Sequence, residues 1–261
     1  MKHWVRFQEA QPEDGANSGF GALDGDTIAV HTGDMFADPT PTGETRALAD
    51  VTLATPCQPG QVLALWNNSR AIAEKQGLSQ PDDPLFFLKA PGSWLAPGGV
   101  IRKPAAYDGR VIYEAELGVV IGKTCAAVSP EDAATVIFGY TCVNDVTALQ
   151  TLDLDPTFPQ WARAKGYDTF CPFGPVIATG IDLTDATIRA TLNGRERQNY
   201  PLTDLFLQPT EIISKLSHMV TLHPGDLIAC GTGPGALPMK PGSTIDITID
   251  NIGTLSNTYE A

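Results

Sequence analysis

Positive charge is scarce in this sequence of 261 residues. Only 17 lysine and arginine residues stand against 30 aspartate and glutamate residues, and the formal net charge is −13. Proteins that bind nucleic acids present a basic face to the phosphates, so this composition argues against a nucleic acid partner. An anionic substrate would need a local cation to draw it into a site.

Long apolar runs are missing as well. No stretch approaches the roughly 20 apolar residues of a transmembrane helix, and the N-terminus, MKHWVRFQEA, lacks the apolar core of a secretory signal peptide. The sequence is nevertheless 43% hydrophobic, which is enough for a sizeable core. We therefore expect a globular, cytoplasmic protein that does not bind membranes.

Cysteine is sparse and widely spaced. The cysteines are odd in number and form no Cys-x-x-Cys pair; they are Cys57, Cys125, Cys142, Cys171 and Cys230. This spacing is typical of reduced, buried thiols and not of a disulfide framework or a zinc site. A catalytic pair of one cysteine with one of the four histidines is the less favoured alternative.

Turn residues divide the chain into a small N-terminal lobe and a larger domain. The lobe contains short strand-like stretches and a patch rich in proline, glycine and threonine, and the segment PCQPGQ at 56–61 is typical of a linker. We therefore predict a β-rich lobe over residues 1–58 and a second domain over residues 59–261.

Strand patterns dominate the larger domain. Residues 187–192 alternate apolar and polar side chains and end at Asn193-Gly194, a frequent two-residue hairpin turn. Residues 243–249 alternate isoleucine with polar side chains, which indicates a strand with one buried face. The predicted fold class is therefore α+β and rich in β-strands.

Three helices interrupt the predicted strands. One follows a strand at 61–65 and is closed by Gly77. A second is capped by Ser129 and is expected to end at Gly139. The third is capped by Thr210 and has an apolar face formed by Ile212, Ile213, Leu216, Met219 and Val220.

The stretch VIYEAELGVVIGK at 111–123 is typical of a buried strand, yet it carries Glu114 and Glu116. Residues i and i+2 of a strand project from the same face, so both side chains are expected to point the same way. Burying unpaired carboxylates is costly, and neighbouring ones repel each other, but a divalent cation would compensate both. The alternative is a half-exposed edge strand with an acidic face, which the unbroken apolar run LGVVI disfavours.

A third carboxylate belongs to Asp145, which follows the strand-like stretch 140–143. Lys165 and Asp168 lie further along, in a segment that we expect to be a loop. The three carboxylates have no histidine or cysteine nearby in the sequence, so they offer only oxygen ligands. That set favours Mg²⁺, Mn²⁺ or Ca²⁺ over zinc.

Four motifs follow one another along the chain: YEAELGVVIGK, GYTxxND, KGYDTFxPxGP and PGDLIAxGT. Together they resemble the fumarylacetoacetate hydrolase family over about residues 60–257. The segment PLFFLKAP at 84–91 is similar to the branch of that family that contains the 2-hydroxyhepta-2,4-diene-1,7-dioate isomerase/5-carboxymethyl-2-oxo-hex-3-ene-1,7-dioate decarboxylase. The resemblance implies a mixed β-sandwich roll, a homodimer and a role in aromatic catabolism.

The resemblance also implies functions for individual residues. It implies a divalent metal, Mg²⁺ or Mn²⁺ with Ca²⁺ as an alternative, held by Glu114, Glu116 and Asp145. It places Lys165 beside the metal as a catalytic residue, and Gly231 and Thr232 against a carboxylate of the substrate. A 2-oxo or 2,4-dioxo acid would then react through an enolate, with Lys165 stabilising the oxyanion or moving a proton.

Hydrolysis would also need a base that activates water. Hydrolytic members of the family use a histidine followed three residues later by a glutamate. Glu74 fits the glutamate and is a catalytic candidate, but Ala71 stands at the histidine position. Leu149 and Leu152 hold the places of an arginine and a glutamine that often follow the metal aspartate, and Gln150 is shifted.

Three functions therefore stay open. The first is a metal-dependent hydrolase that cleaves a C–C bond in an acylpyruvate-like 2,4-dioxo acid. The second is a decarboxylase or isomerase of 2-oxo-enoic dicarboxylates, which needs no activated water and is favoured by the missing histidine. The third is a non-catalytic protein that binds a metal or a small acid, which the retained Lys165 disfavours. Neither His218, expected at a helix end, nor His223, expected in a solvated turn, replaces the missing base.

Overall fold

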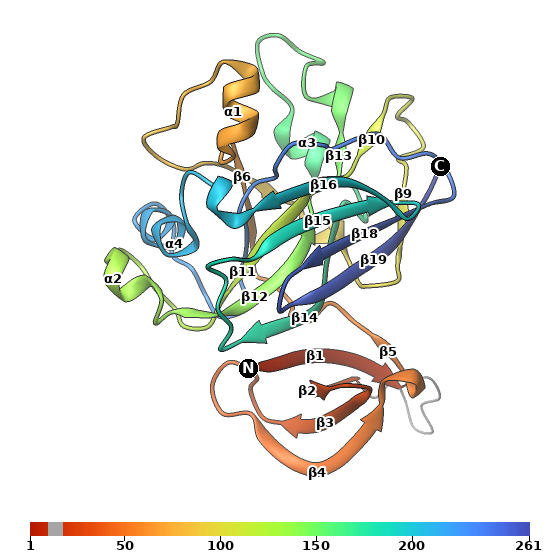
Figure 1. The fold of residues 1–261 in the computed structure, drawn as a ribbon, viewed down its shortest axis with the longest axis vertical. Coiled ribbons are helices and arrows are strands. Elements are labelled where there is room, and N and C mark those ends of the chain that lie inside the picture. The colour runs from red at the N-terminus through yellow and green to blue at the C-terminus, as the bar shows by residue number, and fades with distance from the viewer. Residues whose placement is uncertain (10–17) are drawn as a thin grey trace.

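Strands dominate the computed structural model, which describes residues 1–9 and 18–261 (Figure 1). They form a 12-stranded sheet, a 5-stranded sheet that packs against it, and a 2-stranded ladder. The α-helices of the described residues are short and lie around the sheets. The β-rich α+β fold predicted from the sequence is therefore confirmed.

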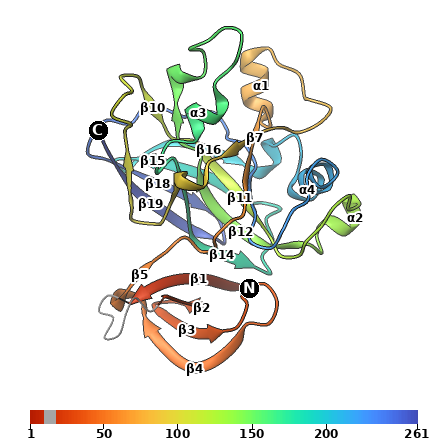
Figure 2. The ribbon, with the colours of Figure 1, turned by 180° about the vertical axis from the view of Figure 1, so that it is seen from behind.

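The N-terminal strands extend one end of the large sheet and lie together below the rest of the molecule in Figures 1 and 2. They are β1 (Lys2–Glu9), β2 (Ser18–Asp24), β3 (Thr27–Thr32), β4 (Thr40–Ala47) and β5 (Val51–Leu53). β1 pairs with β2, with β5 and with β14 (Cys171–Thr179) of the larger domain. Strand pairing therefore continues from the lobe into the larger domain, and the division at residues 58 and 59 stays a prediction.

Beyond β14, the large sheet continues in the order β12 (Ile137–Asn144), β11 (Ala115–Ile121), β17 (Leu227–Ala229), β6 (Val62–Trp66) and β7 (Leu85–Lys89). A further strand, β8 (Trp94–Leu95), pairs with β14. β11 is buried along its whole length, and its neighbouring residues Val119 and Val120 pack into different apolar clusters. Burial on both faces explains why this strand shows no alternation in the sequence.

The 5-stranded sheet packs against β11, β12 and β14. Its order is β16 (Arg195–Pro201), β15 (Thr187–Leu192), β18 (Ser243–Ile249), β19 (Gly253–Glu260) and β9 (Val100–Arg102). The alternating isoleucines of β18 are buried in the core, as predicted. The predicted hairpin is also confirmed, because Asn193 and Gly194 join β15 to β16 with positive φ angles of 52° and 73°.

The helix closed by Gly77 is confirmed as α1 (Arg70–Gln76). The Ser69 side chain accepts a hydrogen bond from the Ile72 N–H at its start, and Gly77 ends it in the left-handed region. By contrast, the loop expected around Lys165 is wrong in part, because α3 (Trp161–Lys165) forms a short helix there. Packing of α3 against β7 stabilises a turn that local sequence preference does not reveal.

The helix capped by Ser129 is much shorter than predicted. α2 (Pro130–Ala133) begins at the expected cap but ends six residues before Gly139, which lies within β12. A Cβ at Gly139 would lie 2.4 Å from the Ala178 carbonyl oxygen of β14. This glycine therefore allows two strands to approach each other, and it does not terminate a helix.

The predicted strand over 111–123 is interrupted beside its first acid. β10 (Val111–Ile112) pairs with β13 (Thr147–Ala148), whereas β11 pairs with β12. Glu114 lies at the junction, where its N–H donates to the side-chain oxygen of Asn144 at 3.1 Å. The chain therefore changes its partner strand next to a predicted metal ligand.

Helix α4 (Pro209–Ser217) starts before Thr210, so the predicted cap is wrong. Gln208 is the N-cap, and its N–H donates to the Glu211 carboxylate at 2.9 Å. The Gln208 side-chain amide also donates to two backbone carbonyls, those of Leu202 and Leu205. A proline at the first helical position and an acid at the third are the sequence signals for this cap.

The apolar face of α4 agrees with the prediction only within the helix. Ile212, Ile213 and Leu216 are buried. Met219 and Val220 lie beyond the end of the helix, and Met219 is 44% exposed.

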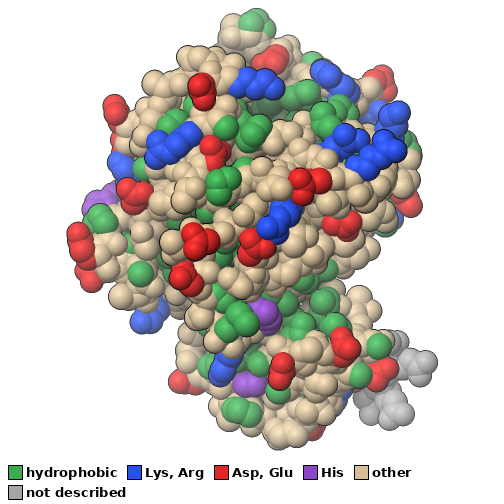
Figure 3. Space-filling model, in the orientation of Figure 1, with side chains coloured by type: hydrophobic (Ala, Val, Ile, Leu, Met, Phe, Trp, Pro, Cys, Tyr) green, Lys and Arg blue, Asp and Glu red, His purple; other side chains and the backbone are tan. Residues whose placement is uncertain are grey.

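All five cysteines are buried and free, as the sequence predicted. His218 at the end of α4 and His223 in a turn are both exposed, again as expected. In the described ranges, no helix combines the length and the apolar character that crossing a bilayer requires. Acidic side chains are spread over the face in Figure 3 and do not gather in one patch.

Replacing Gln208 with alanine tests the observed cap of α4. The change removes the side-chain hydrogen bonds to two carbonyl groups, so we expect the free energy of unfolding to fall by about 1 kcal/mol. Thr210→Ala is the matched control and should change it by less than about 0.5 kcal/mol. Urea unfolding followed by circular dichroism measures both, and an equal loss in the two variants would contradict the cap.

Candidate functional site

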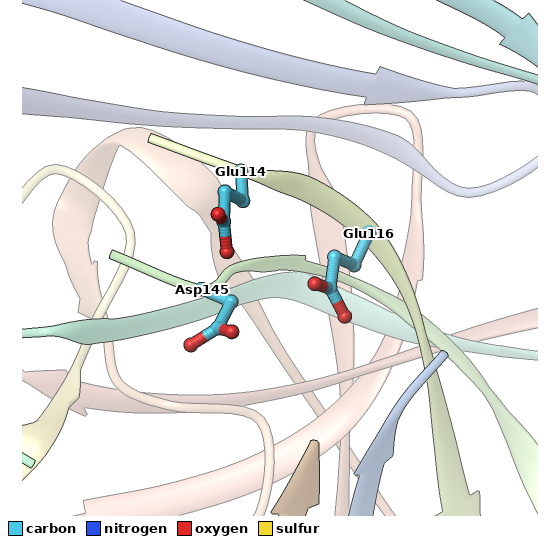
Figure 4. A group of neighbouring side chains, drawn as sticks. All are labelled: Glu114, Glu116 and Asp145. Carbon is cyan, nitrogen blue, oxygen red and sulfur yellow. The ribbon is translucent and has the colours of Figure 1, made fainter. Parts of the chain in front are cut away.

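A cavity of about 460 Å³ is lined by helices α1 and α3, by the ends of β6 and β11, and by the loop after β17. Three carboxylates converge on it, those of Glu114, Glu116 and Asp145. One oxygen atom of each lies within 4.8 Å of the others, and Figure 4 shows the side chains grouped together. The structure therefore brings the three predicted metal ligands to one place.

Glu116 is buried, with 1% of its surface exposed. The Gly231 N–H donates to one of its carboxylate oxygens at 2.8 Å, and Gly231 adopts a φ of 92° that favours glycine. No ammonium or guanidinium of the described chain pairs with Glu116. Burial, together with the charges of Asp145 and Glu114, raises the pKa of Glu116 well above its usual value.

Asp145 is held by two buried lysines. The Lys165 ammonium lies 2.5 Å from Oδ2 of Asp145 and also pairs with Glu114, while Lys89 pairs with Oδ1. Burial alone would raise the pKa of Asp145, but the two lysine charges hold it below its usual value. Burial would lower the pKa of Lys165, yet the two carboxylates raise it, so the ammonium stays charged.

The charges of this cluster do not balance. Three carboxylates face two ammonium groups, which leaves one net negative charge when all five groups are ionised. Burial also raises the pKa of Glu114, against the attraction of Lys165. An additional cation would offset this charge, and an all-oxygen donor set fits a hard divalent ion such as Mg²⁺ or Mn²⁺. The residues present therefore fit the metal that the family resemblance implies.

Lys89 is a site residue that the sequence interpretation missed. It is the last residue of β7, and its side chain is fully buried against Asp145. A signal was present, because a lysine that ends the apolar run LFFL must find a carboxylate if it is buried. The sequence could not show that Asp145 is that partner, since the two residues are far apart in the chain.

Gly231 and Thr232 lie beside the carboxylates, but their polar groups already have protein partners. The Gly231 N–H is used by Glu116. The Thr232 hydroxyl donates to the Ala115 carbonyl and accepts from the Gln198 side-chain amide, both at 2.9 Å. Thr232 does line the cavity. Contact of this pair with a substrate carboxylate stays a prediction.

Helix α1 lines the cavity through Ile72, Lys75 and Gln76, but not through Glu74. Glu74 is exposed, so the structure does not bring it to the three carboxylates. Among the described residues that line the cavity there is no histidine. The catalytic role of Glu74 stays a prediction that this geometry does not support.

Leu149 and Leu152 both line the cavity, where the family resemblance leads one to expect polar side chains. Gln150 faces elsewhere: its side-chain oxygen accepts hydrogen bonds from the Tyr107 hydroxyl at 2.7 Å and from the Arg110 N–H at 2.8 Å. Gln150 therefore fixes the local backbone, and the wall of the cavity at this position is apolar.

Comparison with known protein families divides the chain into two matched segments. Residues 61–260 match the model of the fumarylacetoacetate (FAA) hydrolase C-terminal family. Residues 2–56 match the Rv2993c-like, N-terminal family. The first match covers most of the chain, including every residue assigned to the cavity.

Two curated relatives extend this likeness. Protein Rv2993c of Mycobacterium tuberculosis (strain ATCC 25618 / H37Rv) is 39% identical over 233 residues, which are 88% of this chain and 85% of that protein. The oxaloacetate tautomerase YisK of Bacillus subtilis (strain 168) is 36% identical over 225 residues, which are 81% of this chain and 74% of that enzyme.

Two solved structures share the whole fold. A 2-hydroxyhepta-2,4-diene-1,7-dioate isomerase from Mycobacterium marinum superposes with a TM-score of 0.89 at 35% identity, covering 100% of this chain and 98% of that one. A maleylpyruvate hydrolase from Sphingobium sp. SYK-6, in complex with manganese(II) and pyruvate, gives a TM-score of 0.78 at 30% identity, with 100% and 99% covered. The predicted similarity to the isomerase branch is confirmed.

Replacing Lys89 with methionine tests its role in holding Asp145. The change leaves a buried acidic cluster with one ammonium fewer, so without added metal we expect the free energy of unfolding to fall by about 3 kcal/mol. Lys123→Met, at an exposed lysine, is the control and should have almost no effect. Chemical unfolding in a chelating buffer measures both, and equal stability of the two variants would contradict this role.

The raised pKa of Glu116 predicts how stability depends on pH. Without metal, the folded state holds this proton more tightly than the unfolded chain, so the free energy of unfolding falls as pH rises from the ordinary value of 4.5 through the raised pKa. Glu116→Gln removes this titration and should flatten the fall. Because metal binds the ionised carboxylate, stabilisation by Mg²⁺ should grow over the same interval in the wild type alone. Thermal unfolding across pH, with chelator or Mg²⁺, measures both effects; parallel curves for the two proteins would contradict the prediction.

Proposed function

The chain belongs to the fumarylacetoacetate hydrolase family, and from this premise we propose that it is a divalent-metal-dependent enzyme that converts 2-oxo acids through their enolates. The observation that carries the proposal is the grouping of Glu114, Glu116 and Asp145 beside the Lys165 ammonium in one cavity. The three carboxylates would hold Mg²⁺ or Mn²⁺. When bound, such an ion supplies Lewis-acid chemistry that withdraws electrons from the 2-oxo group of a substrate.

Lys165 is suited to stabilise the negative charge of an enolate. It is buried and charged, and its ammonium carries three N–H donors. Two donors go to Glu114 and to Asp145 Oδ2, while the remaining contact, to the Asp145 carbonyl oxygen, is long at 3.5 Å. One donor is therefore free to turn toward a substrate oxygen, where a charge-assisted hydrogen bond favours the developing oxyanion.

Decarboxylation or keto–enol isomerisation fits this site best. Both reactions form an enolate, and neither needs a base that activates water. No histidine of the described residues lines the cavity, and Glu74 is exposed outside it. In decarboxylation, the bond to CO₂ breaks, the Lys165 ammonium would donate a proton to the enolate carbon, and water would restore that proton to the lysine. In conversion of an enol to its ketone, the proton that leaves the enol oxygen would restore it instead. The likeness to an enzyme named as an oxaloacetate tautomerase supports this choice.

Hydrolysis of a 2,4-dioxo acid is the second candidate. It is favoured by the likeness to a maleylpyruvate hydrolase whose structure contains manganese(II) and pyruvate. In this chain, Glu74 sits on the same short helix as Ile72 and Gln76, which do line the cavity, so a movement of α1 is required to bring it to the substrate. A purely binding role is disfavoured because it would not need Lys165. A homodimer and a role in aromatic catabolism stay predictions of the family resemblance.

The two candidates give different products. Oxaloacetate and an acylpyruvate are incubated with the protein and either Mg²⁺ or a chelator. Decarboxylation releases CO₂, isomerisation changes the enol absorbance without loss of carbon, and hydrolysis yields pyruvate plus a second acid. Absence of any metal-dependent conversion of 2-oxo and 2,4-dioxo acids would overturn the proposed function.

Lys165→Met tests the oxyanion role directly. We expect kcat to fall by about 100-fold or more, since a preorganised donor to an oxyanion has an effect of that order. Mg²⁺ binding, measured by calorimetry, should persist because the three carboxylates remain. Lys123→Met, at an exposed lysine, serves as the control with unchanged kcat. Turnover of Lys165→Met at the native rate would remove the lysine from the mechanism.

A further inference from the structure

We propose that an apolar groove beside the cavity binds an alkyl or aryl tail of the substrate. The groove, called the tail groove below, has a volume of about 650 Å³ and is lined by Trp66, Leu85, Phe86, Phe87, Leu152, Asp153, Pro159 and Trp161. This inference rests on the proposed function, because it assigns a substrate class to the same site: 2-oxo acids whose remote end is apolar.

The tail groove adjoins the cavity that contains the carboxylates. Four residues line both spaces, namely Trp66, Phe87, Leu152 and Trp161. In the proposed binding mode, the 2-oxo acid group of a ligand lies at the carboxylates and its tail passes these shared side chains into the groove. The occupant of the groove is then part of the substrate itself.

A row of aromatic rings runs from the Lys165 ammonium to the exposed side of the tail groove. The Lys165 ammonium lies 5.2 Å from the centroid of the Phe87 ring. Phe87 stacks on Trp161 with a centroid distance of 5.2 Å, and Trp161 meets Trp66 edge-on at 5.9 Å. Trp66 is 39% exposed and Leu85 is 42% exposed, so part of the apolar surface of the groove faces water. A bound tail would remove these surfaces from water.

The charges around the two spaces disfavour a second carboxylate on the substrate. No arginine of the described residues lines either space. The acidic side chain of Asp153 lines the tail groove and would repel a remote anion. Outside the carboxylate cluster, Lys75 is the cation that lines the cavity within the described chain, and it does not line the tail groove. Leu149 and Leu152 present apolar surface where a remote acid would need a donor.

A matched set of ligands tests the groove by calorimetry in the presence of Mg²⁺. Pyruvate has no tail, 2-oxooctanoate has an alkyl tail, and 2-oxooctanedioate has a tail of the same length ending in a carboxylate. Because each buried methylene contributes about fourfold in affinity, we expect 2-oxooctanoate to bind at least about tenfold more tightly than pyruvate. The dicarboxylate should bind no more tightly than pyruvate.

Leu152→Arg should reverse this preference. We expect the affinity for 2-oxooctanoate to fall by about tenfold and the affinity for 2-oxooctanedioate to rise. Leu154→Arg is the control, because Leu154 lies two residues away, is 58% exposed and lines neither space. Equal binding of the alkyl and the dicarboxylate ligand in the wild type would overturn the inference. So would a change of oligomeric state in Leu152→Arg with unchanged ligand preference, since a second copy of the chain would then cover the groove.

Pyruvate separates failure of this inference from failure of the proposed function. If pyruvate binds only with Mg²⁺ and Glu116→Gln abolishes that binding, the metal site is as proposed. The affinities of the two longer acids then test the tail groove separately. If pyruvate and both longer acids fail to bind with Mg²⁺, the proposed function is wrong and the tail groove loses its basis.

Discussion

Electrostatic compensation within a buried cluster of acids determines how this site is built. Carboxylates from separate parts of the chain are brought so close that their ionised forms repel each other, and protein ammonium groups offset only part of that repulsion. Lys165 offsets two acids at once, whereas Glu116 relies on one backbone N–H. The two lysines therefore offset two of the three carboxylate charges, and the remaining negative charge is the one that the proposed metal would offset.

The large sheet holds this cluster in place. β11 carries Glu116, its neighbour β12 leads directly into Asp145, and β7 at the edge ends in Lys89. Just beyond the paired parts of β11 and β12, the Asp145 N–H donates to the Glu114 carbonyl at 2.9 Å, which fixes the backbone of these two predicted ligands. The apolar wall comes partly from β6 and β7 of the same sheet, and partly from α3 and the loop before it. The sheet thus positions the carboxylates and Lys89, and the loops contribute to the shape of the pocket.

The sequence was sufficient to predict the fold class and the three clustered carboxylates, because strand periodicity and ordered motifs are local signals. It failed where long-range pairing overrides local preference. Gly139 looked like the end of a helix but lets two strands approach, and the strand over 111–123 breaks at Glu114 because its partner changes there. Lys89 was missed because its partner is remote in the chain, and no local pattern shows that Glu74 would be exposed.

The pairing of β1 with β14 has a consequence for how such proteins can be assembled during evolution. β1 covers the end of β14 that would otherwise present unpaired backbone groups at the rim of the catalytic sheet. A bare rim of this kind recruits strands from other chains and leads to aggregation. Recombination that exchanges the first segment for an unrelated one must therefore provide a new cover for β14. The lobe thus protects the edge of β14, and its sequence can change only as long as one of its strands still pairs with β14.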